Sequence, residues 1–416
     1  MSSSKSGVVF SYDDIWLIDG VRTPFADYNG VFGRVSPIDL GIKAARGVFA
    51  RTGIKPTEVG SVVAGSMAQA SFDAYVLPRH VSIYAGVPLN VPAILVQRVC
   101  GTGMEVLLQL SDAITLGKIQ LGLGVGAESM SRNPIASYTL RGGMTLGRPE
   151  FGDFLVESLT DTAFGGSMGD TAERLAVEYK LSRDDVDRFA LSSFERALAA
   201  QQSGFLAGEI VPVSTETFEL EGYKPRGIKL PREVKELAVD THVRPSPLET
   251  LAKIRPAFGG VQTGGNSSAI VDGAAAALVA SGAYCRDRKI APLARISCGA
   301  VVGVPPDNMG IGPAVAIRAL LDARGLKLSD IDRFEINEAF GAQCLAVERE
   351  LGIDHAKLNP NGGAIAIGHP LAASGLRLSI TVARELRRSK TRYGISSACI
   401  GGGQGIAVLI ENPDLV

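Results

Sequence analysis

An internal repeat constrains the fold of this chain more than any other feature of its sequence. Residues 52–66 and 324–338 share one pattern: Gly, a branched apolar residue, Lys, any residue, a hydroxyl residue, an acidic residue and a β-branched residue. The two segments are offset by 272 positions, as Gly53 is from Gly325, and the same offset aligns Thr102-Gly103 with Ser374-Gly375. We therefore predict two copies of one unit, at about residues 10–130 and 287–416.

Each copy has the pattern of an α/β unit. Its first helix ends at a glycine, the residue that most easily adopts the left-handed conformation after a helix. Apolar runs that alternate with helices indicate sheets covered by helices on both faces. The predicted elements are helices at 37–52 and 313–324, strands at 59–64 and 331–336, helices that open just after Cys100 and near Ala372, and strands at 122–127 and 394–400.

The middle of the chain, about residues 131–268, does not repeat. We predict an amphipathic helix at 170–180 and a second one after Ser182, which with Asp185 has the spacing of a capping box. The stretch 220–256 carries eight Lys/Arg and five Asp/Glu, a pattern of either a solvated loop or an anion contact. A run of small apolar residues at 273–283, mostly alanine, predicts a buried helix.

The composition excludes several classes of protein. Lys plus Arg number 42 and Asp plus Glu 43, so the basic surplus of a nucleic-acid binder is absent. No apolar run reaches the roughly 18 residues of a membrane span, and the first residues lack the apolar region of a secretory signal. Five cysteines without a Cys-x-x-Cys pair argue against a disulfide framework or a metal site and fit a reducing cytoplasm. Glycine is in excess, at 49 of 416 residues, and must serve turns, close backbone approaches or sites.

Four segments, each beside glycine or at a strand end, carry residues that could do chemistry. Cys100 stands where a helix begins, and a helix dipole favours the thiolate and lowers the pKa of the thiol. His369 lies between Gly368 and Pro370, and Cys399 precedes Gly401 and two further glycines, whose N–H groups suit an oxyanion. Asn337 and Glu338 end an apolar strand. Taken singly, each segment keeps a structural alternative: a buried thiol, a structural histidine, a glycine-rich turn and a strand-end cap.

Together and in this order, the segments resemble the thiolase family over nearly the whole chain. The resemblance is carried by residues 19–25, 128–131, 168–173, 255–258, 264–268, 272–275, 337–340 and 368–370, and by Cys399 with its glycines. It implies an α/β thiolase fold: two duplicated βαβαβαββ-type core domains in a layered α/β/α/β/α arrangement, with an inserted loop domain. The expected domains are an N-terminal core at 1–130 and 269–286, a loop domain at 131–268 and a C-terminal core at 287–416.

The family joins or cleaves 3-ketoacyl-CoA thioesters by a ping-pong Claisen reaction. The resemblance implies that Cys100 attacks as a thiolate and holds the acyl group as a thioester. His369 would be its base, and Cys399 the acid/base at the α-carbon of acetyl-CoA. His369 and a water held by Asn337 would form one oxyanion hole. The backbone N–H groups of Cys100 and Gly401 would form the other.

Coenzyme A is expected as a substrate, with no permanently bound cofactor, no metal and no nucleic-acid partner. By resemblance, Ser268 would contact the pantetheine, Phe258, Met309 and Phe340 would line its tunnel, and Met168 would lie near the acyl group. Arg232, in the basic stretch, is a candidate for the CoA phosphates. The resemblance also implies a homodimer or homotetramer, and we expect a cytoplasmic enzyme of fatty acid metabolism, such as β-oxidation.

Three positions depart from the family pattern. Ser167 stands where many short-chain thiolases have histidine, and Ala269 and Ala372 stand where glycine is usual. The missing histidine favours a 3-ketoacyl-CoA thiolase, and an acetyl-CoA acetyltransferase specific for acetoacetyl-CoA is the alternative. A non-catalytic, thiolase-like CoA-binding subunit is the alternative from another class. A decarboxylating ketoacyl synthase shares the fold but fits the Asn337–Phe340 and Cys399 segments less well.

Overall fold

The computed structural model describes residues 7–68, 74–144 and 146–415. One large sheet runs through it, in the order β17-β18-β19-β16-β2-β15-β6-β4-β5, with β1 paired to β16 and β3 to β15. Its strands are β1 (Val8–Ser11), β2 (Ile15–Arg22), β3 (Ala26–Asp27), β4 (Ser61–Gly65), β5 (Ala93–Val96), β6 (Leu121–Glu128), β15 (Val271–Ser281), β16 (Ala294–Gly303), β17 (Arg333–Ile336), β18 (Tyr393–Ile400) and β19 (Gln404–Glu411).

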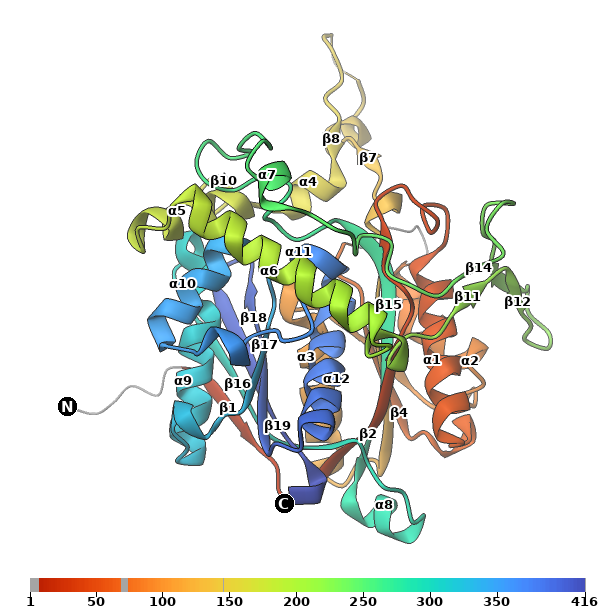
Figure 1. The fold of residues 1–416 in the computed structure, drawn as a ribbon. Coiled ribbons are helices and arrows are strands. Elements are labelled where there is room, and N and C mark those ends of the chain that lie inside the picture. The colour runs from red at the N-terminus through yellow and green to blue at the C-terminus, as the bar shows by residue number, and fades with distance from the viewer. Residues whose placement is uncertain (1–6, 69–73, 145, 416) are drawn as a thin grey trace.

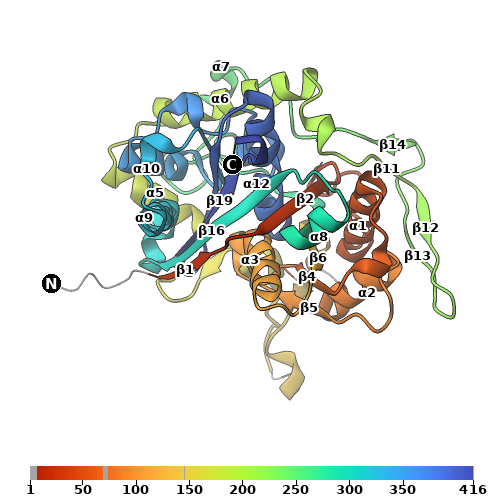
Figure 2. The ribbon, with the colours of Figure 1, turned by 90° about the horizontal axis from the view of Figure 1, so that it is seen from below.

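The helices cover this sheet in layers (Figures 1 and 2). They are α1 (Pro37–Thr52), α2 (Leu77–Tyr84), α3 (Thr102–Thr115), α4 (Phe154–Ser158), α5 (Met168–Glu178), α6 (Arg183–Gln202), α7 (Leu248–Leu251), α8 (Gly282–Asp287), α9 (Gly312–Arg324), α10 (Gly341–Leu351), α11 (Ala364–Ile367) and α12 (Leu371–Ser389). Helices α3 and α12 lie between the two halves of the sheet, with α1 and α2 outside one half and α9 and α10 outside the other. This is the predicted α/β/α/β/α arrangement.

The two halves repeat one topology. Strands β4-β6-β15-β2 pair in the same order and directions as β17-β18-β19-β16. Both ends of β18 lie 272 positions after those of β6, and both first helices end at a left-handed glycine, Gly53 (φ +70°) and Gly325 (φ +63°). The predicted duplication is therefore confirmed. The second copy differs at the position of β5, where the described residues form only an isolated bridge between Phe334 and Leu358.

Two glycines bring the central helices into backbone contact. A Cβ atom added at Gly103 of α3 would lie 2.4 Å from the backbone N of Leu376, and one at Gly375 of α12 would lie 2.4 Å from that of Met104. These glycines are the pair that the repeat aligns. Any larger side chain at either position would push α3 and α12 apart. Because α3 begins just after Cys100 and α12 just after His369, this contact also fixes the distance between the two helix starts.

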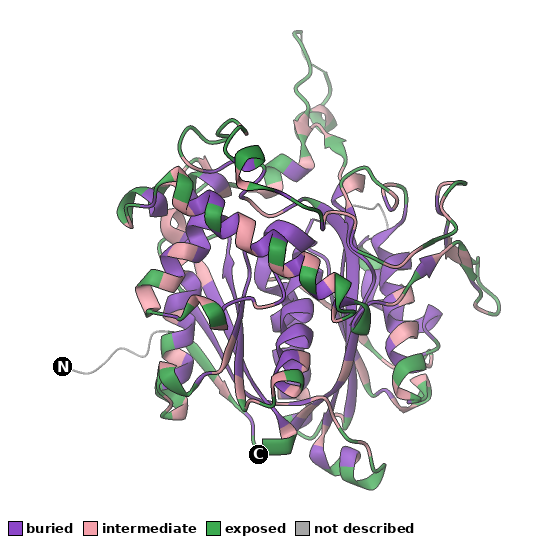
Figure 3. Cartoon of the chain, in the orientation of Figure 1, coloured by how far each residue is buried: buried purple, intermediate pink, exposed green. Residues whose placement is uncertain are grey.

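The helix predicted at 273–283 is wrong. These residues belong to β15, which lies between β6 and β2 and is buried at ten of its eleven positions (Figure 3). Alanine favours helices by local propensity, but tertiary packing overrides a weak preference. In this central strand, small side chains let helices pack closely on both faces, and α8 begins only after the strand ends.

The middle of the chain lies across one end of the layers, where α5, α6 and α7 are labelled (Figure 1). The predicted helices are present as α5 and α6; α5 begins two residues earlier than expected, and both helices open with a capping box, from Ser167 to Asp170 and from Ser182 to Asp185. Short hairpins make up much of the rest: β7 (Ile135–Ala136) with β8 (Gly152–Asp153), β9 (Thr160–Asp161) with β10 (Gly166–Ser167), β11 (Val213–Ser214) with β14 (Glu236–Leu237), and β12 (Glu216–Phe218) with β13 (Arg226–Ile228). The domain boundaries stay predictions. In the described part of the chain, every helix is too short or too polar to span a membrane.

Candidate active site

Cys100 lies in a tight turn between β5 and α3. The turn, Val99–Gly101, is a single 3-10 turn that leads directly into the helix. Val99 has φ +43°, a conformation that is unfavourable for a β-branched residue and is tolerated only where the surroundings impose it. The Thr102 hydroxyl stabilises the turn, because it accepts a hydrogen bond from the Arg98 N–H (2.9 Å) and donates one to the Val99 carbonyl (2.7 Å). Cys100 is thereby held at the start of α3.

The electrostatics of Cys100 differ from the expectation. Burial raises the pKa of its thiol to about 11, and the nearby Glu128 carboxylate adds to the increase. The backbone N–H groups of Gly401 and of Cys100 itself act in the opposite direction, but they do not outweigh burial. The side chain is only 7% exposed. The helix-dipole argument is therefore wrong for the free protein, and the resting group is a thiol.

His369 is held from both ring nitrogens. Its Nδ1 lies 2.6 Å from the Ser374 hydroxyl, which itself donates to the Pro370 carbonyl oxygen (3.2 Å). The Ser374 oxygen therefore accepts from Nδ1–H, and Nε2 carries the lone pair. The side-chain amide of Asn337 donates to that Nε2 at 3.3 Å. The nitrogen of His369 that can accept a proton is therefore Nε2, on the side of the ring that faces Asn337.

The imidazole of His369 is neutral at physiological pH. Burial lowers its pKa to about 3, and the Arg377 guanidinium contributes to the decrease. The turn that carries it needs a glycine, because Gly368 has φ +105° and a Cβ there would meet Val271. A buried, neutral imidazole can take the proton of a buried thiol only in a concerted step with attack, since burial disfavours both the imidazolium and the thiolate.

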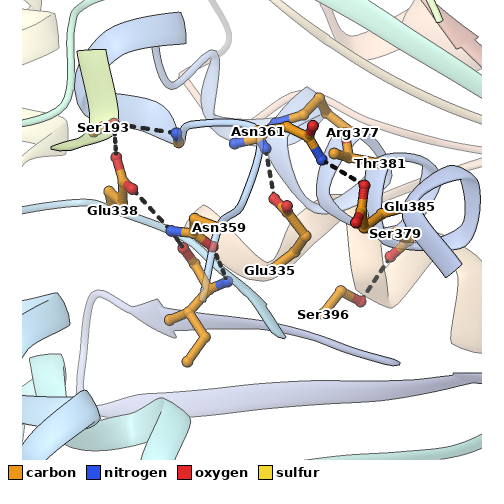
Figure 4. A network of polar contacts seen from close by, with 12 residues as sticks. Ser193, Glu335, Glu338, Asn359, Asn361, Arg377, Ser379, Thr381, Glu385 and Ser396 are labelled. Atoms are coloured by element: carbon orange, nitrogen blue, oxygen red, sulfur yellow. Dashed lines mark hydrogen bonds and ion pairs between the residues drawn. The ribbon is translucent and has the colours of Figure 1, made fainter. Parts of the chain in front are cut away.

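Asn337 and Glu338 follow β17 and are buried. The Asn337 amide oxygen has no hydrogen-bond partner among the described residues, so it is available to a ligand. The Glu338 carboxylate accepts from the Ser193 hydroxyl (2.6 Å), the Asn359 amide (2.9 Å) and the Ile365 N–H (3.1 Å) (Figure 4). Glu338 therefore fixes the segment that leads into the His369 turn.

Cys399 and Gly401 lie at the turn between β18 and β19. Cys399 is fully buried, in an apolar cluster with Met309 and Ala339 against which Met168 and Phe340 pack. Burial raises the pKa of its thiol well above the usual value, and the charge of Cys100 acts in the same direction. The two cysteines are therefore close enough to influence each other's ionisation, as the prediction of two thiols in one site requires.

The other predicted substrate contacts surround Cys399. The rings of Phe258 and Phe340 meet edge to face, with centroids 6.1 Å apart, and the Ser268 N–H donates to the Ala339 carbonyl (3.0 Å). A cavity of about 250 Å³ opens between Val99, Met168 and Gly401. Its remaining lining residues are Ser158, Thr160, Asp161, Thr162 and Gly402. The structure thus gathers Cys100, His369, Asn337, Cys399, Gly401 and five of the six predicted substrate residues at one end of the sheet.

Arg232 is the predicted residue that the structure places elsewhere. It lines a separate, open cavity of about 780 Å³ together with Arg34 and Lys229. The two cavities share no lining residue. Arg232 stays a prediction for a phosphate contact, now as one of three cationic side chains on that cavity.

Comparison with known proteins identifies the family. Residues 15–283 match the model of the thiolase N-terminal domain, and residues 290–412 match that of the thiolase C-terminal domain. The chain belongs to the thiolase family. It is 41% identical to the 3-ketoacyl-CoA thiolase of Bos taurus mitochondria, over 96% of this chain and 98% of the relative. It is 39% identical to the acetyl-CoA acetyltransferase of Shinella zoogloeoides, over 95% of this chain and 98% of that relative.

A solved structure gives the same result for the fold of this thiolase. The crystal structure of human mitochondrial 3-ketoacyl-CoA thiolase in complex with CoA superposes with a TM-score of 0.90, at 39% identity, over 96% of this chain and 98% of that chain. The chain is therefore an enzyme, an acyltransferase of the thiolase type. Among the described residues, no cluster of His, Cys, Asp and Glu could hold a metal ion.

The three departures of this thiolase have structural explanations. The Ser167 hydroxyl takes part in the capping box of α5, so its short side chain serves the helix start. The backbone N–H of Ala269 donates to the Ala364 carbonyl, and the Ala269 carbonyl accepts from the His369 N–H. Ala372 is buried in the first turn of α12. Both alanine methyl groups are buried in the fold.

Ser374 contacts His369 but was not predicted as a site residue, although the repeat aligns it with Thr102. We expect Ser374→Ala to lower kcat about 10- to 100-fold, because His369 loses the acceptor that fixes its tautomer, with little change in KM for CoA. Steady-state kinetics measure this. Ser379→Ala is the matched control: Ser379 is also buried in α12, but it binds Gly375 and Ser396 instead. Equal losses in both variants would contradict the role of Ser374.

Proposed function

We propose that this thiolase is a 3-ketoacyl-CoA thiolase, which cleaves 3-ketoacyl-CoA with CoA and catalyses the reverse condensation with acetyl-CoA. One observation carries the proposal: the cavity at Val99 and Gly401, which lie close to Cys100 and Cys399 in the chain, has no histidine among its lining residues. Ser167, at the position where many short-chain thiolases have histidine, caps α5 instead. The relative from Bos taurus is named for the same activity. The alternative, an acetoacetyl-CoA-specific acetyl-CoA acetyltransferase, is favoured by the relative from Shinella zoogloeoides.

In the first half-reaction, Cys100 attacks the 3-keto carbon of the substrate. Its thiol proton passes to Nε2 of His369, and the bond between C2 and C3 breaks. The acyl group stays on the Cys100 sulfur as a thioester, and the released enolate takes a proton from Cys399 to become acetyl-CoA. The developing oxyanion accepts hydrogen bonds from the N–H groups of Cys100 and Gly401, which already act on the sulfur in the free protein.

In the second half-reaction, CoA takes the acyl group from Cys100. The CoA thiol gives its proton to the Cys399 thiolate that the first half-reaction leaves, and it attacks the thioester carbonyl. The bond to Cys100 breaks, and the Cys100 thiolate recovers a proton from His369. Burial favours the neutral forms of Cys100 and His369, and the second half-reaction restores both after the first has charged His369.

The bound CoA thioester would extend from Cys399 past the apolar side chains that surround it. Met309, Phe340 and Phe258 would line the tunnel, with Met168 near the acyl group and Ser268 on the pantetheine. Arg232 is proposed as a contact for the CoA phosphates, and CoA acts as a substrate with no permanently bound cofactor. A variant Arg232→Ala that leaves KM for CoA unchanged would remove this residue from the proposal.

We also propose a cytoplasmic homodimer or homotetramer that takes part in fatty acid metabolism. The edge strand β5 supports the assembly, because it pairs with β4 on one side only and exposes Ile94 (56%). Unpaired strand edges with apolar side chains favour pairing with another chain. The five cysteines, all free, fit a reducing compartment.

A panel of 3-ketoacyl-CoA substrates tests the proposed function. The panel spans acetoacetyl-CoA to long chains and includes branched and aromatic acyl groups. We expect a higher kcat/KM for longer acyl chains than for acetoacetyl-CoA. Turnover of acetoacetyl-CoA alone would favour the acetyltransferase alternative, and binding of CoA without any turnover would favour a non-catalytic subunit.

A further inference from the structure

Glu128 is a buried acid at the end of β6. Its side chain is 0% exposed, and in the described part of the chain no Lys, Arg or His forms an ion pair with it. Burial raises its pKa. A buried carboxylate without a cationic partner is costly unless hydrogen bonds stabilise it. Its surroundings must therefore supply that stabilisation.

Four hydrogen bonds converge on this carboxylate. One oxygen accepts from the Ser66 hydroxyl (3.1 Å) and the Ala68 N–H (3.0 Å), and the other from the N–H groups of Met67 (3.0 Å) and Ala372 (3.0 Å). Three of the donors are backbone groups, which cannot accept a proton in return. The arrangement fits the ionised, acceptor-only form of the side chain.

The four donors come from both copies of the repeat. Ser66–Ala68 follow β4 in the first copy, and Ala372 lies in the first turn of α12 in the second. Pro370, the residue before α12, has no side chain that can cap the helix. The first N–H groups of a helix need acceptors and favour a nearby negative charge. Glu128 therefore acts as a cap for α12 that is supplied by the other half of the molecule.

The segments that Glu128 joins are those that carry the candidate chemistry. Met67 and Ala68 pack with Cys100 and Leu371 in one apolar cluster. Leu371 and Ala372 follow the His369 turn without any intervening loop. The approach is close, because a Cβ atom at Gly126 would lie 2.1 Å from the Ala372 carbonyl oxygen. A shift in the first turn of α12 is therefore transmitted directly to His369.

We propose that Glu128 is a positioning residue, which fixes the first turn of α12, and with it His369, against the wall of the Cys100 site. It acts through the backbone of Met67, Ala68 and Ala372. The proposal rests on the proposed function, because it assigns a role in the step between Cys100 and His369.

The charge of Glu128 provides a readout that a purely structural role would not change. The groups that influence the ionisation of Cys100 are the Glu128 carboxylate, which disfavours the thiolate, and the backbone N–H groups of Gly401 and Cys100, which favour it. Glu128 is the side chain among these groups, and its four hydrogen-bond donors suit the carboxylate form. Its removal should make the Cys100 thiolate easier to form, so alkylation of Cys100 should become faster at a given pH.

Two variants separate the reach of the side chain from its charge. Glu128→Gln keeps the size of the side chain but removes its charge. The amide NH₂ of the new side chain then faces backbone N–H groups that need an acceptor. Glu128→Asp keeps the charge and shortens the side chain. The matched control is Asp272→Asn: Asp272 is also fully buried, in the neighbouring strand β15, but it binds the Ser131 N–H and hydroxyl and makes no hydrogen bond to α12. Each protein is assayed for kcat, KM for CoA, melting temperature and the pH profile of iodoacetamide labelling at Cys100.

We expect both Glu128 variants to lose kcat about 10- to 100-fold, since small displacements of reacting groups have effects of this size, with KM for CoA within about twofold. Labelling of Cys100 at pH 8 should rise about 3- to 10-fold in Glu128→Gln and stay unchanged in Glu128→Asp. Asp272→Asn should lower the melting temperature without either effect. The proposal is overturned if both Glu128 variants keep the wild-type kcat. It is also overturned if Asp272→Asn lowers kcat as much as the Glu128 variants do. If the wild type cleaves no 3-ketoacyl-CoA, the proposed function has failed instead, and the labelling rates still report on Glu128.

Discussion

Replacement of Cys100 by alanine should reduce thiolysis of 3-ketoacyl-CoA by about 10⁴-fold or more, because removal of a covalent nucleophile leaves only binding and oxyanion stabilisation. No other described cysteine can substitute for it. Cys399 is the second thiol of the site, but burial also raises its pKa well above the usual value, and its surroundings are apolar. The measurement is the initial rate of 3-ketoacyl-CoA cleavage with purified protein.

The matched control for this prediction is Cys285→Ala. Burial raises the pKa of Cys285 to about 11, as it does for Cys100, but Cys285 lies in α8 and packs in a different apolar cluster from Cys100. Because Cys285 lies outside the candidate site, its thiol should not be needed for catalysis, and Cys285→Ala should keep wild-type activity. Thiolysis that survives in Cys100→Ala would show that the assignment of the nucleophile is wrong.

Replacement of Cys399 by serine should separate the two halves of the reaction. The acyl transfer to Cys100 needs the nucleophile and His369, so the variant should still take up a labelled acyl group from acyl-CoA. Condensation also needs a proton to move at the α-carbon of acetyl-CoA, and a serine hydroxyl is a much weaker acid than a thiol. We expect condensation to fall about 10²- to 10⁴-fold, the usual contribution of a general acid or base.

Two assays on the same preparation of Cys399→Ser measure this difference. One follows incorporation of the labelled acyl group into the protein, and the other follows formation of acetoacetyl-CoA from acetyl-CoA. Cys344→Ser is the control, because Cys344 is also fully buried but lies in α10. Normal condensation by Cys399→Ser, or loss of acyl uptake together with condensation, would contradict the assigned role.

The sequence predicted those parts of the fold that local signals determine. Gly53 and Gly325 end their helices as expected, because a left-handed C-terminal residue is a local requirement. The capping box from Ser182 to Asp185 is likewise local. The alanine-rich strand β15 was predicted as a helix, because its conformation is set by the strands and helices around it rather than by its own residues.

In the candidate site, too, the features set by local sequence could be predicted, and those set by packing could not. The positions of Cys100, His369 and Cys399 followed from a family pattern, but the ionisation of Cys100 did not, because burial is a property of the folded chain. The role of Glu128 could not be predicted, since Ala372 becomes its neighbour only when α12 packs against β6. Ser374 lies five residues after His369, but its contact depends on the exact turn between Gly368 and α12. Arg232 was chosen from local charge, and the structure places it on another cavity.

The central claim is that an acyl group is held covalently on Cys100. The most direct measurement is intact-protein mass spectrometry after brief exposure to a 3-ketoacyl-CoA without free CoA, followed by peptide mapping at low pH to preserve the thioester. We expect a mass increase equal to one acyl group, located on the peptide that contains Cys100, lost on addition of CoA and absent from Cys100→Ala. Turnover without any acylated protein, or an acyl group on another residue, would contradict it.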